Sequence, residues 1–330
     1  MAPPARRPRP VPDGATLRAV VDRIVRVPDR FRSFTSTAAD AARHFGIDEA
    51  LLTALTDEGL PCGGAGGAGG ASGAGGAGVS GGSDGSGGVR YDQLDLANAS
   101  LSLTLPSARF MAMRGWSAAL RTAAGAHGAA TYAVDVLPAC PPGAGEHGCR
   151  SLASAELRAQ PGFTGPAGGP FTLTRQVRAQ PAQVHPELAE LTGLVADVHF
   201  HYLPAGLRND VGFLRDARLG DCGLVATHLA GEASRLGLTA RRSFGLFLSA
   251  PYSIAHSWLD VRLDGRWVSF DPHLLKLLTG WGLLPASEWP AHRSIGEGAW
   301  RLADHEFVLA THDGAETPLS FPTRVLAGSI

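Results

Sequence analysis

The chain has 330 residues, a formal net charge of −1 at pH 7 and 44% hydrophobic residues. It can bury one large core or two to three smaller ones, and its balanced charge gives no general reason to expect nucleic acid or an anionic membrane as a partner. The cysteines Cys62, Cys140, Cys149 and Cys222 are too irregularly spaced for a disulfide framework. Without an apolar leader or a long apolar run, the sequence predicts a cytoplasmic protein.

The N-terminal region is predicted to form a small helical module over residues 15–106, after a disordered proline-rich tail at 1–14. Capping residues and apolar spacing predict one helix over 38–45 and a second over 48–59. Gly46 between them supplies a tight turn. This is the spacing of a helix-turn-helix.

Residues 63–88 contain almost only Gly, Ala and Ser, and they predict a flexible tract because they cannot bury enough apolar surface to fold. The order of helix, Gly turn, helix, Gly-Leu-Pro and Arg-Tyr-Asp-x-x-Asp-Leu over about 33–105 resembles the small winged helix-turn-helix domains of excisionase and MerR-type proteins. That resemblance implies that the two flanks of the tract are wing strands.

The second helix of this module carries the acidic residues Asp48, Glu49, Asp57 and Glu58. DNA binding draws most of its affinity from Lys and Arg at phosphates, so this helix disfavours nucleic acid as a partner. We expect the module to hold a protein or a peptide, or to pack on the rest of the chain.

A connecting region is predicted over 107–182, with a helix at 108–124 followed by β-like runs at 131–137, 152–159 and 171–179. Cys140, His147 and Cys149 fall in one of its loops. Their spacing matches no zinc pattern, so no metal site is expected there.

Helical spacing returns over 183–219, where apolar residues recur on one side. His199 and His201 form a His-x-His pair, which on a strand would face the same way and could bind a metal. No further ligand cluster accompanies them in the sequence, which favours structural histidines. No metal and no organic cofactor is predicted.

Asp221 is placed to cap a helix that runs from Cys222 to Leu236, which puts the cysteine on the first turn. The unpaired N–H groups and the dipole of a helix N-terminus favour a thiolate, the form in which cysteine is a nucleophile. The N–H of Cys222 could also donate to an oxyanion.

Downstream, a strand from His256 to Leu263 leads into a two-residue hairpin turn at Asp264-Gly265. This turn predicts that Val261 pairs with Val268, so that His256 and Asp271 lie close across the two strands. A cysteine, a histidine or an Asp-Pro is each usually structural when it occurs alone. In this order and spacing they favour a Cys-His-Asp triad.

The motifs Gly-x-Cys, Arg-Leu-Gly-x-x-Ala-Arg, His-x-Trp-x-x-Val-x-x-Asp-Gly-x-Trp and Asp-Pro resemble the transglutaminase-like superfamily of papain-type thiol enzymes over about 190–275. The resemblance implies that Cys222 is the nucleophile, His256 the general base and acid, and Asp271 the carboxylate that orients the imidazole. It also implies an α+β fold, in which a papain-like transglutaminase core over 183–330 accompanies the small winged-helix-like module.

Three further residues, Tyr202, Trp258 and His273, are candidates for contact with the substrate. The second oxyanion donor cannot be placed in the sequence, and His199, His201 and Tyr202 are the candidates for it. Two strands in the tail, 306–311 and 318–326, are expected to extend the catalytic sheet.

The triad favours cysteine-dependent acyl transfer on an amide or thioester, with a peptide, a protein or a carrier-bound acyl group as the substrate. The acceptor can be water or an amine, so hydrolase and acyltransferase chemistry both stay open. The alternative is a non-catalytic binding or regulatory protein that uses the winged-helix-like module to recognise a peptide or DNA.

Overall fold

The computed structural model describes residues 11–64, 88–125, 129–138, 151–166, 170–178, 183–312 and 315–326. Most of the Gly/Ala/Ser tract, and Cys140, His147 and Cys149, lie outside these ranges. The chain divides into two compact units. The first comprises Met1–Phe110 with Tyr202–Gly206, and the second comprises Met111–His201 with Leu207–Ile330.

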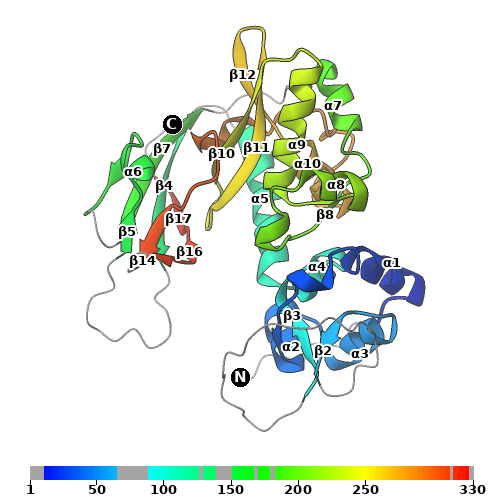
Figure 1. The fold of residues 1–330 in the computed structure, drawn as a ribbon. Helices are drawn as coiled ribbons and strands as arrows, with labels where there is room; N and C mark the ends of the chain where they lie inside the picture. Colours follow the sequence, from blue (N-terminus) through cyan, green and yellow to red (C-terminus); the bar gives the residue numbers. More distant parts are fainter. Residues whose placement is uncertain are drawn as a thin grey trace. The chain divides into compact units, whose positions relative to one another are not determined.

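The first unit contains α1 (Gly14–Ile24), η1 (Asp29–Phe31), β1 (Phe34–Ser36), α2 (Ala38–Phe45), α3 (Glu49–Asp57), β2 (Cys62–Gly63), β3 (Arg90–Asp92) and α4 (Gln93–Ser102). Figure 1 shows these elements in blue and cyan. Helix α1 starts at Gly14, inside the segment expected to be disordered, because the Asp13 side chain accepts the N–H of Thr16 and caps the helix.

The helix-turn-helix predicted from spacing is present in this unit. Thr37 and Asp40 form a capping box at the start of α2, and Gly46 ends α2 with a φ of 67°. The two flanks of the Gly/Ala/Ser tract pair as antiparallel strands β2 and β3, and β1 completes a sheet of order β1-β3-β2. The likeness to a winged helix stays a prediction.

A four-stranded antiparallel sheet of order β12-β11-β10-β13 forms the centre of the second unit (Figure 1). Its strands are β10 (Ala240–Phe247), β11 (Ile254–Leu263), β12 (Arg266–Phe270) and β13 (Ala299–Ala303). Val261 pairs with Val268 and Leu263 with Arg266, so the predicted two-residue turn at Asp264-Gly265 is confirmed. Both turn residues have positive φ, 48° and 79°.

Helices pack on this sheet and bring distant parts of the chain to it. Helix α9 (Cys222–Arg235) contacts β10 and β11, and α8 (Val211–Ala217) packs on α9. Helices α5 (Ala108–Gly125) and α10 (Pro272–Gly280) share an apolar cluster with Phe247 and Trp258 of the sheet. None of the helices within the described ranges combines the length and apolarity needed to cross a membrane.

The tail strands do not extend the catalytic sheet as expected; β13 does, beside β10. The tail instead forms β14 (Ala310–His312), β15 (Ala315–Glu316), β16 (Leu319–Ser320) and β17 (Thr323–Leu326). These pair with strands of the connecting region: β14 with β5 (Ser151–Ala153), and β16 and β17 with β4 (Ala129–Pro138). Strand β4 also pairs with β7 (Phe171–Arg178), which in turn pairs with β6 (Phe163–Thr164).

Two expected elements differ in detail. The run 152–159 is a strand only as far as Ala153, because Ser154 caps a short helix, α6 (Ala155–Arg158). The helix expected from 183 is short, with η2 (Pro186–Leu188) and α7 (Ala189–Gly193) followed by turns. After them β8 (His199–Phe200) runs parallel to β9 (Leu219–Gly220), the segment that leads into α9.

Because β10 and β13 approach each other closely at Gly245, we expect this position not to tolerate a larger residue. A Cβ at Gly245 would lie 1.9 Å from the carbonyl oxygen of Trp300, next to a register shift between these strands. We expect Gly245→Ala to lower the free energy of unfolding by about 1–3 kcal/mol, because a backbone strand must move. Gly231→Ala is the matched control, since that exposed site in α9 has open space and should gain about 0.5–1 kcal/mol. Urea denaturation measures both, and an unchanged Gly245→Ala would contradict the strand pairing.

Candidate active site

Cys222 is the first residue of α9, and its side chain is partly exposed. The helix starts here because Asp221 adopts an extended conformation and its Oδ1 accepts the N–H of Leu224 at 2.9 Å. Gly220 precedes the cap where space is scarce: a Cβ there would lie 2.8 Å from a methyl of Val225. The thiol therefore stands at a capped helix N-terminus, as the sequence predicted.

His256 and Asp271 meet across the hairpin. The Nε2 of His256 lies 2.6 Å from Oδ2 of Asp271, and both side chains are buried. The other oxygen, Oδ1, accepts the N–H of Leu274 at 2.8 Å, so the same carboxylate caps α10. A carboxylate fixed at both oxygens holds the imidazole in one orientation and leaves Nδ1 for another partner.

That other partner is Cys222. Burial alone would lower the pKa of His256, but the Cys222 thiolate and hydrogen bonds to Asp271 and to the Cys222 side chain raise it to about 10. At neutral pH the imidazole is thus protonated. The structure brings the three predicted residues together as an interacting set.

Three aromatic rings surround the imidazole. Trp258 stacks on it with ring centroids 6.3 Å apart and an interplanar angle of 19°, while Phe247 and Trp116 lie at 6.2 and 6.4 Å. Trp116 comes from α5, and no sequence pattern indicates its place here because it lies more than 100 residues before Cys222. These rings desolvate the His256–Asp271 bond, which strengthens it.

Trp258 was a candidate for substrate contact, but only 1% of its surface is exposed. Its indole N–H donates to Oδ1 of Asp260 at 2.8 Å. The same carboxylate accepts hydrogen bonds from Ser243 and Ser269. Trp258 is therefore a fixed wall behind the imidazole rather than an open face for a substrate.

His273 is also buried, with 3% exposed. Its Nε2 donates to the carbonyl oxygen of Gly220 at 3.2 Å, and its Nδ1 has no partner among the described residues. Burial lowers the pKa of His273 to about 4, so the ring is neutral at pH 7. The hydrogen bond of His273 links α10 to the segment before Cys222. The buried ring lies behind the site rather than on a surface that a substrate could contact.

Tyr202 belongs to the first compact unit, whereas the three interacting residues belong to the second. Within its unit its N–H donates to Asn98 at 2.7 Å, its carbonyl accepts from the Asn98 amide, and Arg109 lies 4.3 Å over its ring. These contacts anchor Tyr202 on the helical module. Its role in substrate contact stays a prediction.

The two histidines of the His-x-His pair differ in exposure. His199 is exposed, whereas His201 is buried, and their backbone N–H groups donate to the carbonyls of Arg218 and Gly220. In the part of the chain that the structure describes, no group of three or more His, Cys, Asp or Glu is arranged to hold a metal ion.

Comparisons with known proteins bear on this site. Residues 197–272, which contain Cys222, His256 and Asp271, match the Transglutaminase-like superfamily. The superfamily assignment made from the sequence is thus supported for this stretch. No curated protein matches the chain.

A search of solved structures finds the crystal structure of "a Putative Cysteine Protease from Cytophaga hutchinsonii". The identity is 12%, the match covers 62% of this chain and 90% of that chain, and the TM-score is 0.29. At that score the likeness carries no argument about this site.

The neutral, buried His273 predicts a stability difference in acid. The pKa of His273 is about 4 in the folded protein and about 6.5 unfolded, so between these values the unfolded chain binds more protons and stability falls as the pH drops. Between pH 7 and 4.5, His273→Gln should lose about 2 kcal/mol less unfolding free energy than the wild type.

Urea titrations at the two pH values measure this difference. A Gln amide can donate to the Gly220 carbonyl in place of Nε2. His256, whose pKa is raised, stays protonated in the folded chain, and its titration in the unfolded chain contributes equally to both proteins. Burial also lowers the pKa of His228, but its contribution is common to both proteins. Equal losses in the two proteins would contradict a neutral imidazole at position 273.

Proposed function

We propose that the protein is a cysteine-dependent acyl-transfer enzyme in which Cys222, His256 and Asp271 form the catalytic triad. The observation that carries the proposal is the imidazole of His256, bonded to a buried carboxylate on one side and to the Cys222 thiol on the other. A thiolate beside an imidazolium is the activated form of a cysteine nucleophile. The match of residues 197–272 supports the same class of chemistry.

In the first step the Cys222 sulfur attacks the carbonyl carbon of an amide or thioester, forming a C–S bond and placing negative charge on the oxygen. The N–H of Cys222 at the start of α9 is a donor for that oxyanion. The intermediate collapses as His256 gives its proton to the leaving nitrogen or sulfur, which leaves a thioacyl enzyme.

In the second step water or an amine attacks the thioacyl carbon and gives its proton to His256. The C–S bond then breaks and the thiolate returns, paired again with the imidazolium. Asp271 stays ionised throughout and keeps the ring oriented. The proposed substrates are peptides, proteins or carrier-bound acyl groups, and the acceptor is set by access to the thioacyl carbon.

Thiol reactivity tests the nucleophile. We expect iodoacetamide near neutral pH to alkylate Cys222 at least about tenfold faster than Cys62, because thiolate is the reacting form. Cys62 is a matched internal control, since both thiols are partly exposed. In a His256→Ala variant the rate at Cys222 should fall while that at Cys62 is unchanged. Peptide mass spectrometry measures both rates. Equal rates at the two cysteines would contradict an activated thiol at Cys222 and favour a non-catalytic protein.

An Asp271→Asn variant tests the orienting carboxylate. Asn can still cap α10, so the thermal midpoint should change little, but it cannot stabilise the imidazolium. We expect turnover of an activated acyl ester, 4-nitrophenyl acetate, to fall by about 10²–10⁴-fold.

The control for this variant is Asp264→Asn at the hairpin turn, which removes the same charge away from the imidazole and should keep full turnover. Adding methylamine to the wild-type reaction separates the two acceptors, because amide product forms only if an amine reaches the thioacyl carbon. A wild-type rate in Asp271→Asn would remove Asp271 from the triad.

A further inference from the structure

A pocket of about 540 Å³ lies on the catalytic sheet, next to the hairpin of β11 and β12. Arg241, Asp260 and Ser269 pair across three adjacent strands and line it together. His256 lies four residues before Asp260 on β11 and therefore on the same face, about 13 Å away along the strand. The volume is in the range of small-ligand sites.

The lining of this pocket carries an excess of positive charge. Its charged residues are Arg175, Arg241, Arg266, Arg301, Asp260 and Glu297. Asp260 already accepts hydrogen bonds from two serines and an indole, at 2.7 to 2.9 Å. Glu297 lies 3.6 Å from Arg175. Among the lining residues, Arg175 pairs with Glu297 and Arg241 with Asp260, so Arg266 and Arg301 have no carboxylate of their own.

Arg241 and Arg301 line the pocket from the neighbouring strands β10 and β13. Arg241 stacks 4.0 Å over the ring of Trp267 and lies 3.4 Å from Asp260. The Nε of Arg301 is buried without a partner among the described residues. Burial, and then repulsion by Arg241, lower the pKa of Arg301, against smaller opposing contributions from Asp260 and Asp304. An anion between the two arginines would relieve that repulsion and occupy the unpaired donor.

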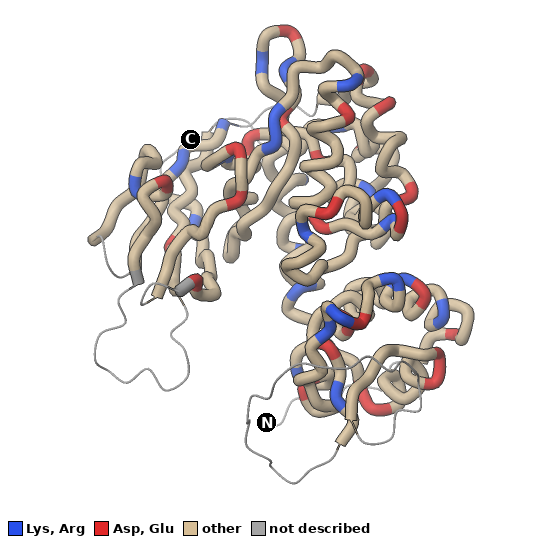
Figure 2. Tube along the Cα trace, in the orientation of Figure 1, with Lys and Arg blue, Asp and Glu red and all other residues tan. Residues whose placement is uncertain are grey.

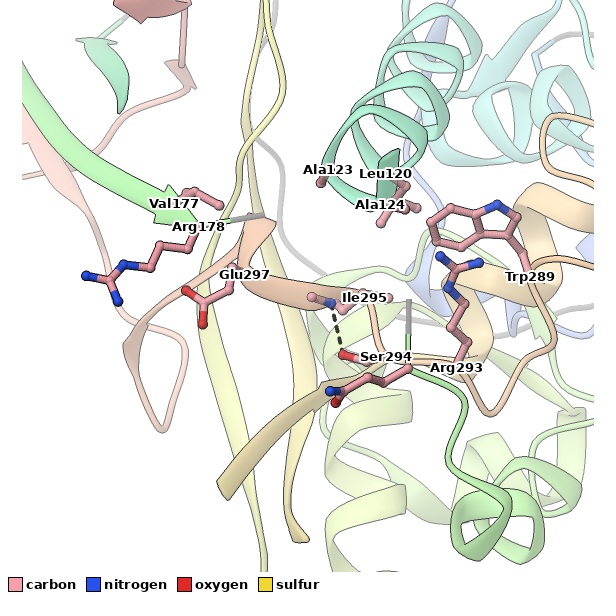
Figure 3. Close-up of a pocket in the computed structure, with 12 residues that line it drawn as sticks. Leu120, Ala123, Ala124, Val177, Arg178, Trp289, Arg293, Ser294, Ile295 and Glu297 are labelled. Carbon is pink, nitrogen blue, oxygen red and sulfur yellow. Dashed lines mark hydrogen bonds between the residues drawn. The ribbon is translucent and has the colours of Figure 1, made fainter. Parts of the chain in front are cut away.

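The smaller adjoining pocket also has two arginines in its lining, Arg178 and Arg293. It shares Ser294 and Glu297 with the larger one, and Figure 3 shows Arg293 on its wall beside Trp289. Arg293 lies 3.4 Å over the Trp289 ring and donates to the carbonyl of Glu288 through its Nη1, while its Nε has no partner among the described residues. Figure 2 shows the basic positions around the β11–β12 hairpin, which borders the larger pocket.

We propose that the larger pocket binds a ligand through a phosphate or carboxylate group held by Arg241 and Arg301. Guanidinium groups recognise both oxyanions through paired, charge-assisted N–H donors. Trp267 and Asp260 fix the Arg241 group, which lowers the ordering cost of binding at that donor. This site uses neither the thiol nor the imidazole and is independent of the proposed acyl transfer.

Calorimetric titration of the full chain with pyrophosphate and with citrate, at constant low ionic strength, tests the site. We expect saturable binding of at least one of them, and at least about tenfold weaker binding in Arg301→Gln, because a charge-assisted bond is lost. Arg158→Gln is the matched control, since it removes the same charge from an exposed position on α6 and should bind like the wild type. Tighter pyrophosphate binding identifies a phosphate ligand, and tighter citrate binding a carboxylate ligand.

A second variant, Arg241→Gln, tests the proposal if Arg301→Gln does not fold, and it should also weaken binding because Arg241 is the other proposed donor. Cys222→Ala should bind as the wild type does, so a failure here is separate from a failure of the acyl-transfer proposal. Absence of saturable binding of both anions, or equal affinity in the wild type and the folded arginine variants, would overturn the proposal.

Discussion

The bond between His256 and Asp271 is the interaction on which the arrangement of the site depends. It exists because a two-residue turn sets the register of β11 and β12, and because β12 ends where α10 begins. One carboxylate therefore serves two purposes: Oδ2 holds the imidazole and Oδ1 caps a helix. A shift of register by one residue would send His256 to the opposite face of the sheet and break its bond to Asp271.

The surroundings of this bond make it stronger than the same pair would be in water. Trp116, Phe247 and Trp258 enclose the imidazole, and Asp260 fixes the indole of Trp258 from behind. In such a low-dielectric setting an unpaired charge is costly, whereas a fully bonded network is rigid. Here Asp271 has both oxygens bonded and Asp260 has several donors, so both buried carboxylates on this face of the sheet are satisfied.

The parts of the site that the sequence predicted are those fixed by local rules. The cap at Asp221 and the turn at Asp264-Gly265 act within a few residues, and from them the placing of Cys222, His256 and Asp271 followed. The parts that were missed depend on distant contacts. Trp116 reaches the imidazole from α5, and β13 joins β10 across more than fifty residues, and neither leaves a periodic signal at its own position.

Two buried aspartates on the same face of the sheet have different hydrogen-bond partners. Asp260 and Asp271 both point from this face, but Asp260 is bonded to hydroxyl and indole donors, whereas Asp271 is bonded to an imidazole and a helix N-terminus. Asp260 also accepts two hydrogen bonds from Arg241 at 3.4 Å, so its charge pairs with that guanidinium and only partly offsets the charge of Arg301. Because Asp271 faces an imidazole, its charge stabilises the imidazolium instead. One face of the sheet thus carries two buried carboxylates with different cationic partners, a guanidinium for Asp260 and an imidazole for Asp271.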